Sequence, residues 1–577
     1  MSEQSFLRVA LGYQEIFGVA PTWDALIARL RQYSLPQVLG TIGRISGVLD
    51  ALHRSHPIAQ KRICDGLFGD RSKEVWAAIL AWIRKERAQE GPQAMPTLFH
   101  EQQLITMAKV AFLVLDAAET KTSDALEGLA EALLMLNNLQ DSVSSSHPDA
   151  DPSTPDGMKV WQLHFLANGL FHTGETEIHT LPRAYDLYLT DKPHLVEDPA
   201  FLDLRGLLTQ ATGIDPETTW FVLFALMAHW RNIEPEAIGQ GSWVMDPRQY
   251  FSTLDFSEAE QTAFLKLACL SIEEMQEQVR SQYTLKSLKP YHVLPFARWP
   301  LVSTGGKIMC VSIELLKHKL TEGFYHLFLD PEKFPERADR ERYLHYMGSV
   351  FEDYVARLLK RSWIPPACRH HSEAEYKTSV SGERCDFLIL EGDSVVLLEA
   401  KATRFPLAAR TEESWDQFAR AFNDIFIDGA SQIDNTVREI ERGKLVHMGI
   451  DPTKVRRYFP LIVTLENLPL TRPIYQKVKD DVATAGFLQG PRVAPIQAMD
   501  IGDLEFIEIG IQTGYSLVQI LEGKVGNVEA CALSMSNYLL ANQAPFVMGP
   551  VNQFLSEIFE RLSARALELF RSRKRVV

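Results

Sequence analysis

The sequence has few cysteines and no two of them in a CxxC arrangement. Among its 577 residues the six cysteines are scattered: Cys64, Cys269, Cys310, Cys368, Cys385 and Cys531. A disulfide framework or a cysteine-based zinc site needs cysteines at close or regular spacing. We therefore expect free thiols.

The chain also lacks a long hydrophobic run. Its most apolar stretch, residues 220–230, is shorter than the roughly 20 residues that cross a bilayer and is typical of a buried helix. The first residues contain acidic side chains and no basic start followed by an apolar core, so they do not resemble a signal peptide. These features predict a cytoplasmic protein without a membrane partner.

An excess of positive charge is missing as well. The formal net charge is −15, which excludes a protein that coats nucleic acid along its whole surface. The charge is unevenly distributed, because residues 331–480 hold 23 basic and 24 acidic side chains, a net charge of −1. The remainder carries −14, so the middle segment repels a polyanion least.

Several enzyme signatures are absent. No GxSxG, HExxH or dinucleotide-binding glycine pattern occurs. Gly305-Gly306-Lys307 lacks the rest of a phosphate-binding loop, and the apolar runs on both sides favour a two-residue β-hairpin turn.

Hydrophobic periodicity predicts an α+β protein with four domains. Residues 1–140 have helical spacing, and residues 158–330 are mainly helical with the small hairpin. The segment 141–157 is rich in Ser, Asp and Pro and predicts a linker or a long exposed loop. Residues 335–500 alternate helices with short strands, and residues 501–577 form a predicted helical C-terminal extension.

The third domain has a distinctive order of predicted elements. Residues 343–360 have helical spacing, and three strands are expected at 373–378, 385–391 and 394–400. Residues 411–442 are mostly helical, and 458–465 predict a buried strand. This order predicts a mixed sheet flanked by helices.

The second and third of these strands meet at Gly392-Asp393, a pair that favours a two-residue hairpin turn. A turn there places Asp386 directly opposite Glu399. Opposed side chains in an antiparallel pair share a face, with Cβ atoms roughly 5 Å apart. Lys401, two residues beyond Glu399, shares that face too. One hairpin therefore gathers two carboxylates and an ammonium group.

Two adjacent carboxylates repel each other, so this cluster makes chemical sense when a hard divalent cation lies between them. Mg²⁺ fits best, with Mn²⁺ as a substitute. Lys401 would then hold or activate the attacking water and offset charge in the transition state. The alternative is an ordinary salt-bridged hairpin face at the surface, which is common and contributes little energy.

The spacing of Asp386, twelve residues, then Glu399-Ala400-Lys401 resembles the PD-(D/E)xK, or restriction-endonuclease-like, superfamily of phosphodiesterases. In that family the helix before the sheet often supplies a third acid, and Glu352 in GSVFEDYVARLL is the matching residue. Helical spacing places Glu352 at the edge of the apolar face, directed at the sheet, whereas the next residue, Asp353, is directed away from it. A later helix carries a glutamine in some branches, which Gln432 resembles. The resemblance covers about 125 of the 577 residues.

Two positions depart from the family pattern. Cys385 precedes Asp386 where the family has proline, and Thr436 stands where the recombination-nuclease branch has tyrosine.

The resemblance implies a restriction-endonuclease-like core and a Mg²⁺-dependent nuclease, with DNA favoured over RNA and a role in defence against foreign DNA. The implied catalytic residues are Glu352, Asp386, Glu399, Lys401 and Gln432. The implied metal ligands are Glu352, Asp386, Glu399 and Ala400. The helical N-terminal half would supply a homo-oligomer contact or bind a protein partner.

Two other functions stay open. One is an inactive nuclease-like fold that serves as a nucleic-acid-binding or scaffold module. The other is a helical interaction protein with a small unrelated α/β insert, which requires a different hairpin register. His370 and His371, expected just before the first strand, and Arg384, Arg404 and Arg410 are further candidates for phosphate contacts.

Overall fold

The structure is a computed structural model that describes residues 7–52, 56–87, 94–117, 123, 125–144, 154, 157, 177–231, 243–252, 256–289, 292–362, 368–404, 415–466, 472–512, 514–527, 530–542 and 552–574. The chain forms two compact units, each assembled from separate stretches of sequence. The first unit comprises Met1–Asp149, Arg205–Leu327 and Ala566–Val577, and the second comprises Ala150–Leu204 and Phe328–Arg565. Among the described helices, none has the length and apolar character needed to cross a membrane.

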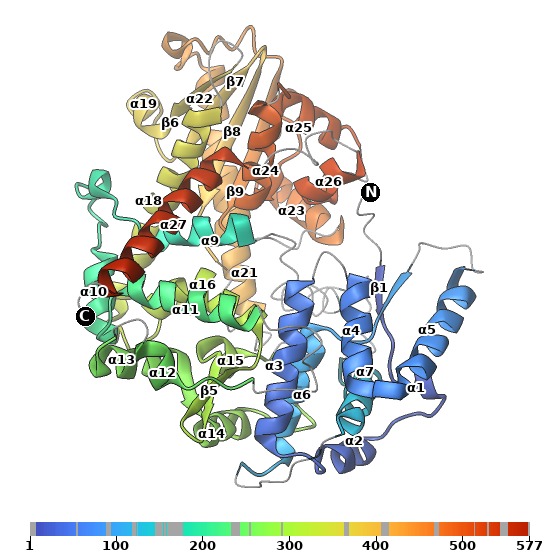
Figure 1. Cartoon of the computed structure of the whole chain (residues 1–577). Helices are drawn as coiled ribbons and strands as arrows, with labels where there is room; N and C mark the ends of the chain where they lie inside the picture. Colours follow the sequence, from blue (N-terminus) through green and yellow to red (C-terminus); the bar gives the residue numbers. More distant parts are fainter. Residues whose placement is uncertain are drawn as a thin grey trace. The chain divides into compact units, whose positions relative to one another are not determined.

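The first unit is mainly helical (Figure 1). Its helices are α1 (Tyr13–Phe17), α2 (Trp23–Leu30), α3 (Leu35–Ala51), α4 (His56–Phe68), η2 (Gly69–Arg71), α5 (Ser72–Arg87), α6 (Glu101–Val114), α7 (Glu127–Ser144), α10 (Leu204–Thr212), α11 (Pro216–Arg231), α12 (Pro247–Ser252), α13 (Glu258–Ala268), α14 (Ile272–Gln282), α15 (Leu294–Arg298), α16 (Ile313–Thr321) and α17 (Gly323–Phe328). Its strands are β1 (Leu7–Ala10), β2 (Ala94–Thr97), β3 (Cys269–Ser271), β4 (Leu301–Thr304) and β5 (Lys307–Cys310).

Three predictions for this unit are confirmed. The apolar stretch 220–230 lies in helix α11, where Trp220 and Trp230 are buried. The strands β4 and β5 pair antiparallel across Gly305-Gly306, and both glycines have positive φ, as a tight hairpin turn requires. The three cysteines of this unit, Cys64, Cys269 and Cys310, are free thiols, as are the three of the second unit.

Two predictions for this unit need correction. Residues 1–140 are not purely helical, because β1 and β2 pair in parallel; strands of four residues are too short to show a clear alternation in the sequence. The predicted linker also begins later than residue 141, since helix α7 continues to Ser144.

The second unit contains the segment that resembles a nuclease. Its helices are α9 (Glu177–Leu189), η3 (Pro193–Leu195), α18 (Arg337–Ser362), α19 (Glu373–Tyr376), α21 (Trp415–Asn423), the π-helix η5 (Asp424–Asp428), α22 (Gly429–Glu441), η6 (Val446–Met448), α23 (Arg472–Thr484), α24 (Ile501–Gln512), α25 (Leu517–Val525), η7 (Ala530–Ala532), α26 (Met535–Ala541) and α27 (Gln553–Lys574), which continues into the first unit. Its strands are β6 (Arg369–Ser372), β7 (Phe387–Glu391), β8 (Ser394–Lys401), β9 (Arg457–Thr464) and β10 (Gln497–Asp500).

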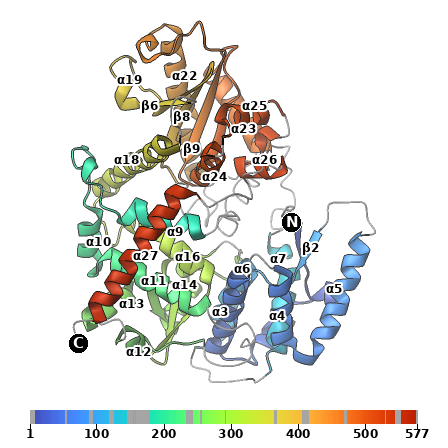
Figure 2. The same ribbon diagram turned by 45° about the horizontal axis from the view of Figure 1, so that its top comes forward.

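These five strands form one mixed sheet in the order β10-β9-β8-β7-β6 (Figures 1 and 2). Strands β6, β7 and β8 pair antiparallel, whereas β9 runs parallel to β8 and β10 runs parallel to β9. The predicted order of a helix, three antiparallel strands, a helical segment and a further strand is confirmed. The fifth strand, β10, was not predicted.

The sheet is covered on both faces. Strand β8 is buried along nearly its whole length, as its run of apolar side chains predicts. On one face, Leu388 and Leu397 pack in a core cluster with the helical segment from α21 to α22. Helix α18 contacts β8, and α24 contacts β9 and β10, but neither helix contributes to that cluster. These two helices therefore cover the other face.

The first strand of the sheet lies earlier than predicted. Residues 369–372 form β6, whereas residues 373–376 of the predicted strand are the short helix α19. The amide of Ser372 donates a hydrogen bond to the Glu375 carboxylate at 3.1 Å. Ser-x-x-Glu is the sequence signature of a capping box at a helix start, and it ends the strand here. His370 and His371 consequently lie within the strand.

Candidate active site at the end of the sheet

The site begins with the turn between β7 and β8. Gly392 has a φ of 61°, and the strands pair from Glu391 with Ser394 to Phe387 with Leu398. The next pair in this register is Asp386 and Glu399, so the predicted register is confirmed. Asp386 directly precedes β7, and its carboxylate oxygen Oδ2 accepts a hydrogen bond of 2.7 Å from the Ala400 amide. The two acids therefore meet where the hairpin ends.

Asp386 is held at the point where the two strands separate. The Cys385 amide, which the register places opposite Ala400, donates instead to the Thr436 hydroxyl on α22 at 3.0 Å. The Tyr376 hydroxyl donates to the Cys385 carbonyl. These two contacts fix the backbone before Asp386. Neither role was predicted from the sequence, in which Thr436 is only a departure from the family pattern.

Glu399 and Lys401 form the centre of the site. Glu399 is 2% exposed, and its Oε1 lies 2.7 Å from Nζ of Lys401. The same ammonium donates a hydrogen bond of 2.7 Å to the side-chain carbonyl of Gln432 on α22. The other oxygen of Glu399, Oε2, is buried and has no hydrogen-bond partner in the described part of the chain.

Glu352 approaches from helix α18, which contacts β8. Burial, followed by repulsion from Asp386, raises its pKa to about 8. The neighbouring Asp353 is directed elsewhere, because it forms ion pairs with Arg357 at 2.9 Å and with His194 at 2.8 Å. Helical spacing predicted this divergence between the two consecutive acids.

The carboxylates of the site carry more negative charge than their surroundings balance. Burial raises the pKa of Asp386 to about 6, although the Ala400 amide and the Lys401 ammonium act in the opposite direction. Burial and the repulsion of Asp386 raise the pKa of Glu399 well above its ordinary value, and Lys401 lowers it in part. One ammonium group thus faces three acids, and in the absence of a cation the ionised form of each acid is less favourable than that of a carboxyl group in water.

The five residues Glu352, Asp386, Glu399, Lys401 and Gln432 are called the sheet-end cluster below. No family model, curated protein or solved structure matches this chain. The function of the sheet-end cluster is therefore argued from its own geometry and chemistry.

The donor atoms for a cation are mainly oxygen. Asp386 and Glu399 offer carboxylates from opposed positions, and Ala400 can offer only its backbone carbonyl. Ligand atoms of Glu352, Asp386 and Glu399 do not all lie within 4.8 Å of one another, so the three carboxylates do not converge on one point in this structure. Oxygen donors of this kind suit Mg²⁺ or Mn²⁺.

Two further residues at the site were not predicted from the sequence. Gly429 begins α22, and a Cβ atom there would lie 3.6 Å from Cγ of Glu399 and only 3.0 Å from Cδ1 of Ile462. Asp424 lies in the preceding π-helix η5, and its pKa is raised by burial and by Asp428 and lowered by Lys401. Insertions of π-helix are frequent at functional sites, but their sequences resemble those of ordinary helices.

Other candidates form contacts of their own. His371 pairs with Glu375 at 2.9 Å, and Arg384 pairs with Glu373 at 2.6 Å. Arg404 donates a hydrogen bond to the Tyr188 hydroxyl at 3.2 Å. Arg410 lies outside the described residues.

Proposed function

We propose that this chain is a metal-dependent nuclease of the PD-(D/E)xK type that hydrolyses phosphodiester bonds, with DNA as the favoured substrate. The observation that carries the proposal is the position of Lys401. Its ammonium contacts Glu399 and Gln432 at 2.7 Å each, on the face that the register assigns to Asp386. The five-stranded mixed sheet with helices on both faces supports a restriction-endonuclease-like core.

Mg²⁺ fits the residues present. The buried Oε2 of Glu399 has no hydrogen-bond partner among the described residues, and leaving a buried carboxylate oxygen without a partner costs free energy. Asp386, Glu399 and the Ala400 carbonyl would hold the ion. When bound, Mg²⁺ would supply positive charge to the scissile phosphate and lower the pKa of water.

The side chains of the chain perform the remaining tasks. The Lys401 side chain is 17% exposed, and its ammonium is held in position by Glu399 and Gln432. It would orient the attacking water and stabilise negative charge that develops on the phosphate in the transition state. Gln432 is a positioning residue, because it contacts Lys401. Glu352, which lies on helix α18 and not on the hairpin that carries the two ligating acids, would position water rather than anchor the ion.

The proposal also accounts for the electrostatic cost of the site. Acids whose pKa values are raised destabilise the folded protein when they are ionised. An inactive scaffold has no physical need to retain three such acids beside one lysine. The near-neutral charge of residues 331–480 is compatible with the approach of a polyanion, and a role in defence against foreign DNA is part of the proposal.

The test is cleavage by the purified full-length chain. Linear and circular double-stranded DNA, single-stranded DNA and RNA are incubated with Mg²⁺, with Mn²⁺ and with a chelator. We expect cleavage of at least one substrate that requires the divalent ion and is lost in Glu399→Gln. Lys454→Ala, a change at an exposed lysine of the same unit, should cleave normally. Metal-independent cleavage, or Glu399→Gln with full activity, contradicts the proposal.

A further inference from the structure

A second group of potential metal ligands lies in the first unit, on helices α16 and α17. His318, Glu322 and His326 are spaced four residues apart, so they recur on one side of the helical path. Glu322 lies between the two helices, but the hydrogen-bond pattern continues across it. Its amide donates to the His318 carbonyl at 2.9 Å, and the His326 amide donates to the Glu322 carbonyl at 3.2 Å.

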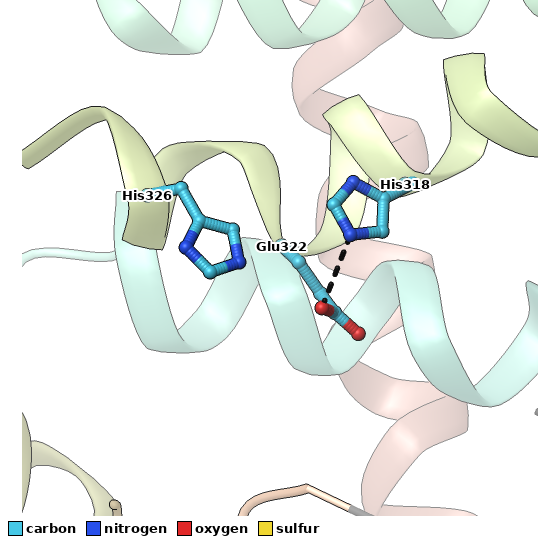
Figure 3. Close-up of side chains that lie close together, drawn as sticks. All are labelled: His318, Glu322 and His326. Carbon is cyan, nitrogen blue, oxygen red and sulfur yellow. Dashed lines mark ion pairs between the residues drawn. The ribbon is translucent and has the colours of Figure 1, made fainter. Parts of the chain in front are cut away.

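The three side chains converge (Figure 3). Each offers one ligand atom, and these atoms all lie within 4.8 Å of one another. Nε2 of His318 lies 3.3 Å from a carboxylate oxygen of Glu322. The two imidazole rings are nearly parallel, with an interplanar angle of 8° and centroids 6.0 Å apart. We call these three residues the histidine cluster.

His318 provides an independent indication of a ligand. Its side chain is 13% exposed, and both of its ring nitrogens are buried without a hydrogen bond in the described part of the chain; Nε2 has the 3.3 Å contact with the Glu322 carboxylate, which is an ion pair only when the imidazole is protonated. An imidazole always has at least one N–H donor, and a buried donor or acceptor without a partner is costly. A bound ion would satisfy the nitrogen that faces Glu322.

We propose that the histidine cluster binds one divalent transition-metal ion of the Zn²⁺ class. Two imidazoles and one carboxylate form a ligand set that Zn²⁺ accepts in tetrahedral geometry, with a fourth position left for water or another ligand. Imidazole ligands favour Zn²⁺ over Mg²⁺, which prefers oxygen. The ion would link the end of α16 to α17 across the break at Glu322 and would stabilise this part of the first unit.

The experiment separates this site from the sheet-end cluster. The double variant Asp386→Asn, Glu399→Gln is stripped with a chelator and titrated with Zn²⁺ and, separately, with Co²⁺ alone. We expect it to bind one equivalent of either ion, and the Co²⁺ complex to show the visible absorption of a low-symmetry, four-coordinate site. Failure to bind an equivalent of Zn²⁺ overturns the proposal, and it does so without bearing on the nuclease assignment.

Single substitutions in the Asp386→Asn, Glu399→Gln double variant test which residues of the histidine cluster bind the ion. His318→Gln and His326→Gln should each weaken Zn²⁺ binding by at least ~10²-fold, since even indirect contacts to a metal contribute 10- to 100-fold. His447→Gln, at an exposed histidine of the second unit, should bind Zn²⁺ normally. Unchanged affinity in both histidine variants contradicts the proposal.

X-ray absorption of the Zn²⁺ complex provides a test that does not depend on how these variants fold. Scattering from two imidazole nitrogens at about 2.0–2.1 Å is expected. Sulfur ligands, or oxygen ligands only, would overturn the assignment.

Discussion

The sheet-end cluster and the histidine cluster are built in different ways from similar residue types. The sheet-end cluster combines oxygen donors and a lysine from a helix, a hairpin and a second helix, spread over residues 352–432. The histidine cluster uses two nitrogen donors and one carboxylate from nine consecutive residues. Oxygen donors beside an ammonium group suit a Mg²⁺ ion that acts on phosphate, whereas imidazoles suit a tightly held Zn²⁺. On the two proposals above, the sheet-end cluster is a site for reaction and the histidine cluster is a site for stability.

The largest expected effect comes from removing the carboxylates of the sheet-end cluster. Asp386→Asn and Glu399→Gln should each reduce cleavage by ~10³-fold or more and abolish Mg²⁺ binding in calorimetry, because each removes an anionic ligand. Zn²⁺ uptake by the histidine cluster should not change. If either variant lost Zn²⁺ uptake together with Mg²⁺ binding, the two clusters would not be separate sites.

Lys401→Ala should have the next largest effect and should separate metal binding from chemistry. The ammonium contacts Glu399 but is not a ligand, so Mg²⁺ affinity is expected to stay the same or increase. Cleavage should fall by ~10²-fold, as when a group that stabilises the transition state is deleted. Lys454→Ala provides the matched control for loss of a lysine. Wild-type cleavage by Lys401→Ala would favour an ordinary salt-bridged hairpin face instead.

The sequence was sufficient to place the hairpin part of the site. An antiparallel pair joined by a two-residue turn has a register set by counting from Gly392-Asp393, and this count placed Asp386 opposite Glu399. Helical spacing likewise distinguished Glu352 from Asp353. Both arguments use local periodicity, which side chains elsewhere in the fold do not alter.

Contacts between distant elements could not be predicted in this way. The Thr436 hydroxyl accepts a hydrogen bond from the Cys385 amide, although the two residues are 51 positions apart in the sequence. No local pattern predicts such a bond. Strand β10 has only four residues and is specified by its partner β9. The histidine cluster does have a local signal, the i, i+4, i+8 spacing, but convergence of its side chains across the break at Glu322 required the structure.

Gly429→Ala tests how closely α22 packs on the sheet-end cluster. The added Cβ would lie 3.0 Å from Cδ1 of Ile462 and in van der Waals contact with Glu399 at 3.6 Å, so the Ile462 side chain or the start of the helix must move by a few tenths of an ångström. Overpacking of this kind costs about 1–3 kcal/mol, and we expect a matching loss in thermal stability and a ~10-fold loss in cleavage. Gly348→Ala in α18 is the control, because its Cβ would meet no atom within 4 Å. It should be neutral or stabilising. Equal behaviour of the two variants would show that Gly429 does not shape the site.

The smallest expected effect concerns stability without metal. The folded-state pKa of Glu352 is about 8, above the ordinary carboxyl value of about 4.3. Between these pH values the folded protein holds more protons than the unfolded chain, so the stability of the metal-free protein falls as the pH rises through this window. Glu352→Gln removes that titration. It should raise the melting temperature of the metal-free protein at about pH 8.5. The increase should be roughly 2–4 °C for each kcal/mol gained in the free energy of unfolding.

The same variant should have little effect at about pH 5, where folded Glu352 is already protonated and resembles glutamine. Asp353→Asn, one residue along α18, provides the contrast, because it removes ion pairs with Arg357 and His194 and should not raise the melting temperature at either pH. Differential scanning calorimetry in the presence of a chelator measures both variants. An increase for Glu352→Gln that is equal at the two pH values would show that relief of a buried charge is not its cause. In that case the buried acids of the sheet-end cluster would not need a cation to be stable, and electrostatic repulsion would not distinguish this cluster from the histidine cluster.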